Sequence, residues 1–218
     1  MIKVVSEVDL PVDEKLNIKK NRIEPLGINN GKRISIVTGI HGDELEGQYV
    51  CYKLIEIINK NIDKLCGTVD IYPGINPLGI DSITRGIPAF DLDMNRLFPG
   101  NKNGDMMEFT ASDIIEDIVG SDICIDIHAS NIYLKEIPQI RINELHKDKL
   151  VPLARMMNAD YIWVHADSTV LESTLAYSLN SRNVNTLVVE MGVGMRITID
   201  YCNQLVSGIL NLMKKMGI

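Results

Sequence analysis

The stretch RISIVTGIHGDELEG at residues 33–47 constrains the fold more than any other part of this 218-residue chain. It opens with the apolar, β-branched run ISIV, which predicts a buried strand. It continues into the pattern LEGQYV, which predicts a helix. His41 and Glu44 therefore fall where the strand turns into the helix. In open α/β sheets, ligands bind at this carboxyl edge of the strands.

His41 and Glu44 are three residues apart, so on a helical turn their side chains point the same way. An imidazole nitrogen and a carboxylate oxygen that converge on one point are two ligands for Zn²⁺. Gly42 between them is interpreted as leaving room for a metal, a water or a substrate. Because a four-residue pattern is short, the alternative is a polar turn in which Glu44 caps the next helix.

The composition is that of a globular protein, with 45% hydrophobic and 23% charged residues and a net charge of −7. This charge argues against general affinity for nucleic acid or a membrane surface, because both favour a basic protein. No apolar stretch approaches the roughly 18 residues that a membrane-spanning helix needs, and the acidic N-terminus is unlike a signal peptide. The four cysteines form no CxxC pair, and three lie in apolar patterns. Buried free thiols and a cytoplasmic protein are therefore expected.

The rest of the chain alternates strand and helix patterns. This predicts an α/β fold with a mixed, mostly parallel central sheet and helices on both faces, in one domain over residues 1–218. Strands at 2–8 and 16–23 are expected to form an antiparallel edge. The other expected elements are strands at 68–73, 122–127, 137–142, 161–164 and 185–190 and helices at 44–60, 110–119, 144–157, 172–180 and 197–216. Thr110 or Ser112 is the expected cap of its helix. Residues 80–108 are expected to form a long functional loop.

His128 follows the apolar run DICIDI, so it too ends a core strand. It can join His41 and Glu44 as a third zinc ligand. Two histidines and one glutamate leave a fourth position for water, which is typical of catalytic zinc sites. Asp126 lies two residues before His128 on the same strand face. It is predicted to accept a hydrogen bond from the second imidazole nitrogen.

Glu190 ends the apolar strand NTLVVE, where a carboxylate must be paired or used. It is the candidate general base for water and the later proton donor to a leaving amine. Arginines in the long loop can stabilise an oxyanion or grip a carboxylate. The loop and its approach carry Asn76, Arg85, Asp91, Asn95 and Arg96. His146 and His165 are interpreted as non-ligands, with His146 a solvated surface residue.

These residues resemble the succinylglutamate desuccinylase/aspartoacylase family of zinc carboxypeptidase-like hydrolases. The matching motifs are HGDE at 41–44, NP at 76–77, Arg85, DLDMNRLFPG at 91–100, DIH at 126–128 and VVEMG at 188–192. By this resemblance, the ligands of one zinc ion per chain are His41, Glu44 and His128. The catalytic residues are Glu190, as general acid and base, and Arg85. The substrate-binding residues are Asn95, Arg96 and Arg141.

The reaction implied by the resemblance is metal-assisted hydrolysis of an N-acyl amino acid or a related carboxylate-bearing amide. A carboxypeptidase that acts on a peptide tail is the first alternative, and a metal-binding protein without turnover is the second. The small β-rich domain that follows the catalytic domain in many relatives is expected to be absent, which leaves a more open pocket. DLDMNR is longer than the DLNR-like motif of many relatives and can shift Asn95 and Arg96. A homo-oligomer is compatible with the sequence.

Overall fold

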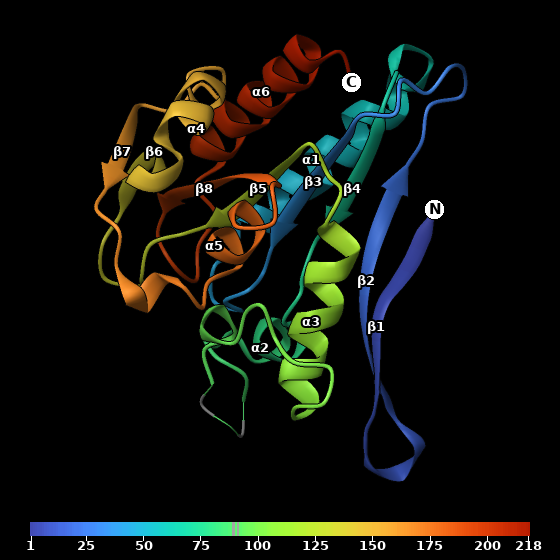
Figure 1. The fold of residues 1–218 in the computed structure, drawn as a ribbon, viewed down its shortest axis with the longest axis vertical. Coiled ribbons are helices and arrows are strands. Elements are labelled where there is room, and N and C mark those ends of the chain that lie inside the picture. The colour runs from blue at the N-terminus through green and yellow to red at the C-terminus, as the bar shows by residue number, and fades with distance from the viewer. Residues whose placement is uncertain (89, 91) are drawn as a thin grey trace.

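The computed structural model describes residues 1–88, 90 and 92–218 (Figure 1). Within these residues, eight strands form one sheet in the order β1-β2-β4-β3-β5-β8-β6-β7. The strands are β1 (Ile2–Asp9), β2 (Lys15–Ile23), β3 (Arg33–Thr38), β4 (Thr68–Tyr72), β5 (Ile123–His128), β6 (Glu136–Asn143), β7 (Tyr161–His165) and β8 (Asn185–Gly192). The helices are α1 (Glu46–Lys60), α2 (Pro77–Ser82), α3 (Met106–Ile118), α4 (Lys147–Ala154), α5 (Leu175–Asn180) and α6 (Ile199–Met216).

The sheet is mixed and mostly parallel, as the sequence predicts. β3 pairs in parallel with β4 and β5, β5 pairs in parallel with β8, and β6 pairs in parallel with β7. The hairpin of β1 and β2 forms an antiparallel edge, and β8 is antiparallel to β6. The carboxyl ends of β3, β5 and β8 therefore lie side by side at one edge of the sheet.

Helices cover both faces of this sheet (Figure 1). Helices α1, α4 and α6 pack over one face, where Ile34 and Ile36 of β3 are buried. Helices α3 and α5 pack over the other, where Val37 is buried. A strand covered on both faces reads as a continuous apolar run, which is why ISIV was recognisable as a core strand. Burying each such side chain contributes about 1.5–3 kcal/mol.

Helix α3 begins earlier than the sequence predicts. Asp105 caps it, because its Oδ1 atom accepts hydrogen bonds from the backbone N–H groups of Met107 (2.8 Å) and Glu108 (3.0 Å). The Glu108 carboxylate accepts the backbone N–H of Asp105 in return. The assignment of Thr110 or Ser112 as the cap is therefore wrong, and both are buried within the helix.

Buried ion pairs fasten the edge hairpin to the sheet. Lys20 of β2 lies 3.1 Å from Asp70 of β4, and the Nε atom of Arg22 donates to the same carboxylate at 2.7 Å. Asp70 is fully buried, so its charge depends on these two cations.

The four cysteines are free thiols, and three of them are buried, as expected. In the part of the chain that the structure describes, no helix combines the length and the apolar character that crossing a bilayer requires.

Candidate metal and substrate site

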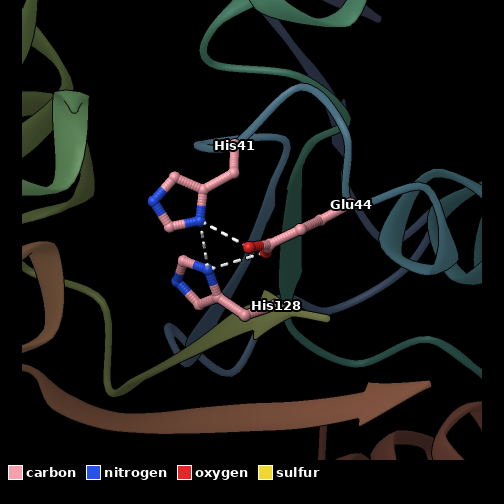
Figure 2. A group of neighbouring side chains, drawn as sticks. All are labelled: His41, Glu44 and His128. Atoms are coloured by element: carbon pink, nitrogen blue, oxygen red, sulfur yellow. Dashed lines mark hydrogen bonds and ion pairs between the residues drawn. The ribbon is translucent and has the colours of Figure 1, made fainter. Parts of the chain in front are cut away.

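His41, Glu44 and His128 meet at the carboxyl edge of the sheet (Figure 2). They come together because β3 and β5 are parallel neighbours, so the segments that end these strands leave the sheet side by side. His41 Nδ1 lies 2.6 Å from Glu44 Oε1, and His128 Nδ1 lies 3.0 Å from Glu44 Oε2. The two Nδ1 atoms are 3.3 Å apart. All three side chains are buried.

Each imidazole also has a carboxylate near its second nitrogen. His41 Nε2 lies 3.1 Å from Asp93 Oδ1, and His128 Nε2 lies 3.2 Å from Asp126 Oδ1. A carboxylate in this position orients the ring and leaves the other nitrogen for a metal. The distance to Asp126 agrees with its predicted role, although the contact is an ion pair rather than an aligned hydrogen bond. The sequence analysis did not identify Asp93 as a partner of His41, although Asp93 lies within the motif DLDMNR.

The three residues fit a divalent metal. One atom from each side chain, two nitrogens and a carboxylate oxygen, lie within 4.8 Å of one another. Two imidazoles and one carboxylate form the donor set of catalytic zinc sites. The backbone N–H of Ala129 also donates to Glu44 Oε2 at 2.9 Å, which holds this carboxylate in place.

The pKa values in this cluster reflect the close pairing of histidines with carboxylates. Burial opposes the charge of Glu44, but the two histidines outweigh it and lower the pKa of Glu44 to about 2. Burial also disfavours a protonated His41, yet hydrogen bonds to Asp93 and Glu44 outweigh it and raise the pKa of His41. These shifts favour a protonated His41 beside an ionised Glu44, and a metal that binds here would have to displace such protons.

The interpretation of Gly42 as open space for a ligand is wrong. A Cβ atom at this position would lie 1.9 Å from the carbonyl carbon of Gly79, in the backbone of α2. The backbone N–H of Gly42 donates to the carbonyl of Thr84 at 3.0 Å. The glycine is needed because the turn that carries His41 and Glu44 packs directly against the segment that contains α2.

Arg85 lies beside the three candidate metal ligands. Its Nη1 atom is 3.3 Å from Glu44 Oε1, and its Nη2 atom is 3.3 Å from Asp93 Oδ2. Asn76 has a structural role instead, because its Oδ1 atom caps α2 by accepting the Gly79 N–H at 2.9 Å. Asp91 lies outside the described residues.

A cavity of about 230 Å³ opens beside the metal ligands. Its wall includes the predicted residues Arg85, Asn95, Arg96, Arg141 and Glu190. Further polar side chains also line it, among them Asn143, His146, His165, Tyr177 and Asn180. Neither additional histidine belongs to the metal group found among the described residues. His146 is partly exposed and also lines the cavity, a position that its interpretation as a surface residue did not include.

The three arginines of the cavity differ in their partners. Arg85 and Arg141 each contact two carboxylates. Arg96 has no carboxylate partner in the described part of the chain, and its Nη1 atom donates to the backbone carbonyl of Asn95 at 2.8 Å. The side-chain oxygen of Asn95 accepts the N–H of Leu175 at 2.9 Å, which leaves its amide NH₂ group available. The Arg96 guanidinium and this NH₂ group can therefore bind an anion.

Glu190 lies near the carboxyl end of β8, opposite His128 in the register of the sheet. Burial raises the pKa of Glu190 to about 7, against the opposing charges of His128 and Arg141. A carboxyl group whose pKa lies near neutrality can both accept and return a proton. The arrangement is chemically competent for water activation next to a metal.

Comparisons with known proteins identify the family. Residues 30–216 match the succinylglutamate desuccinylase/aspartoacylase catalytic domain. No curated protein matches the chain significantly. A solved succinylglutamate desuccinylase/aspartoacylase from Rhodobacter sphaeroides has 24% identity and a TM-score of 0.82 over 97% of this chain and 63% of its own.

Two other solved structures share the fold at lower identity. A succinylglutamate desuccinylase from a Silicibacter species has 20% identity and a TM-score of 0.84, over 97% of this chain and 65% of its own. The product-bound ectoine utilization protein EutE (DoeB) from Ruegeria pomeroyi has 19% identity and a TM-score of 0.82, over 97% of this chain and 65% of its own. The chain thus spans slightly less than two thirds of the length of these structures, and the predicted fold is confirmed.

Proposed function

We propose a function for this chain from the premise that it belongs to the succinylglutamate desuccinylase/aspartoacylase family, whose catalytic domain its residues 30–216 match. It is a zinc-dependent amidohydrolase that removes the acyl group from an N-acyl amino acid or a related carboxylate-bearing amide. The observation that supports this proposal is the cavity itself, because Asn95, Arg96 and Glu190 line it together with the histidines His41 and His128.

His41, Glu44 and His128 are the residues that hold the metal. A bound zinc ion supplies a Lewis acid for the substrate carbonyl and lowers the pKa of a coordinated water. Asp93 and Asp126 keep the two imidazole rings in the orientation that ligation requires.

Substrate binding depends on Arg96 and Asn95. The guanidinium and the amide NH₂ group bind the substrate carboxylate, because a planar donor fork suits a planar acceptor pair. This contact sets the register of the substrate and brings its amide bond toward Glu190. The cavity of about 230 Å³ can hold a single N-acyl amino acid.

Glu190 carries the proton through the reaction. Its carboxylate accepts a proton from water as the oxygen of that water bonds to the acyl carbon. Arg85 donates hydrogen bonds to the carbonyl oxygen as negative charge develops there. Glu190 then gives the proton to the nitrogen as the C–N bond breaks, which yields a carboxylic acid and a free amine.

A hydrolysis screen tests this proposal. The zinc-loaded protein is incubated with N-acetyl, N-succinyl and N-formyl amino acids and with short peptides, and amine release is followed by mass spectrometry. The wild type should release amine, and Glu190→Gln should lose at least about a hundredfold in rate. Glu172→Gln, at an exposed position outside the cavity lining, is the matched control and should stay active.

The outcomes separate the parts of the proposal. Equal rates for the wild type and Glu190→Gln would exclude Glu190 as the base. Cleavage of peptides in preference to N-acyl amino acids would favour the carboxypeptidase alternative. No amine release from any compound, with zinc shown to be bound, would contradict the proposed substrate class.

A further inference from the structure

Arg141 of β6 is held on three sides in the wall of the cavity. Its Nη1 atom donates to Glu190 Oε1 at 3.2 Å. Its Nη2 atom lies 3.0 Å from each carboxylate oxygen of Glu136. Its Cζ atom lies 5.3 Å from the centroid of the Trp163 ring, which is a cation–π distance. The guanidinium is therefore fixed by two carboxylates and one aromatic face.

A bulge in β6 brings Glu136 to this position. Residues five apart in a regular strand point to opposite faces of the sheet. In the pairing with β8, however, Glu136 lies opposite Gly192 and Gln139 lies opposite Glu190, so three steps along β6 match two along β8. The extra residue reverses the alternation and places Glu136 on the same face as Arg141.

These contacts leave neither terminal amino group of Arg141 free to bind a substrate. Both terminal amino groups already contact protein carboxylates, so a substrate carboxylate would have to displace one of them. Arg96 lines the same cavity and has no carboxylate partner in the described residues, so it is the better anion site. None of the described residues donates a hydrogen bond to Glu190 Oε2, and the contact from Arg141 therefore leaves one oxygen of the base available.

We propose that Arg141 is a positioning residue for Glu190. Its hydrogen bond to Oε1 holds the carboxylate in the orientation from which Oε2 accepts a proton, and Glu136 and Trp163 fix the guanidinium. This role takes the place of the substrate binding expected for Arg141 from the sequence. The inference rests on the proposed function of Glu190 as the base. A base acts only when it lies within hydrogen-bonding reach of the proton, so losing its orientation slows the chemical step more than binding.

Kinetics distinguish positioning from substrate binding. Arg141→Met, Arg141→Lys and the control Arg155→Met, at the exposed position that follows α4, are compared on the best substrate of the screen. Arg141→Met should lose about tenfold to a hundredfold in kcat with little change in KM, as is typical when a supporting hydrogen bond is removed. Arg141→Lys should recover part of kcat, and Arg155→Met should match the wild type. An increase in KM at unchanged kcat would overturn the proposal.

A second readout needs no substrate. The protein is labelled with glutamate carrying ¹³C at the side-chain carboxyl, and the Glu190 resonance is assigned by its loss in Glu190→Gln. At one fixed pH, this resonance should move in Arg141→Met and, to a smaller extent, in Glu136→Gln. It should stay in place in Arg155→Met.

The two readouts separate failure of this inference from failure of the proposed function. If no compound of the screen is hydrolysed, the resonance alone decides the role of Arg141. A Glu190 resonance that does not respond to Arg141→Met would overturn the positioning role even in an active enzyme.

Discussion

Replacing Asp93 by asparagine tests whether this loop carboxylate supports the metal ligands. Asp93 Oδ1 lies 3.1 Å from His41 Nε2, and Oδ2 lies 3.3 Å from Arg85 Nη2. Asparagine keeps the shape and the Oδ1 acceptor for the backbone N–H of Asn95 but removes the charge. A hydrogen bond to a charged group contributes about 1.5–3 kcal/mol, and the side chain of Asp93 is 26% exposed, so the loss should not exceed this range. Zinc affinity should therefore fall by about tenfold to a hundredfold, or about 1.4–2.7 kcal/mol.

Competition with a fluorescent zinc chelator at neutral pH measures this change. Asp81→Asn is the matched control, because Asp81 is an exposed carboxylate in the neighbouring helix α2. Far-ultraviolet circular dichroism of both variants checks that the fold is intact. Unchanged affinity in Asp93→Asn would refute the argument that Asp93 orients His41. An equal loss in Asp81→Asn would show a general effect of charge.

Two further predictions concern pH. Hydrolysis by the zinc-loaded protein should rise as the pH passes through the pKa of Glu190, because only its carboxylate accepts a proton. Burial raises this pKa to about 7 in the metal-free protein, and a bound cation would lower it from there. A flat rate between pH 4 and 8 would contradict this. Burial opposes the charge of Asp70, but Arg22 and Lys20 outweigh it and lower its pKa. The resulting stability is present above the unfolded pKa of about 3.9 and is lost as the pH falls through the lower folded value. Asp70→Asn should therefore be less stable at pH 6 and lose less on acidification, as judged by urea midpoints. A loss parallel to that of the wild type below pH 4 would argue against this role.

The sequence by itself was enough for the layout of the fold. Core strands such as ISIV are buried on both faces, and this burial requires an apolar run that can be read locally. The prediction that His41, Glu44 and His128 converge needed one more rule, that parallel strands end at a common edge. These features depend on neighbours in sequence or on general topology, and both are accessible without coordinates.

The ends of the helices were harder to predict from the sequence. Helix α3 begins where Asp105 and Glu108 exchange hydrogen bonds as a capping box. The periodicity of the apolar residues does not show where this exchange occurs. Similarly, the sequence marked Gly42 as special but suggested the wrong reason, because the backbone of Gly79 that fills its side-chain position is 37 residues away along the chain.

The tertiary structure alone decided which polar side chains meet. Asp93 reaches His41 across 52 residues, and Arg141 reaches Glu190 across 49. The bulge that turns Glu136 toward Arg141 comes from the pairing of β6 with β8, which no local pattern specifies. Periodicity reports which face of an element is buried, whereas partners across the sheet depend on strand order and register. For this reason the residue types of the site could be predicted from the sequence. The partners of each of its arginines could be identified only from the tertiary structure.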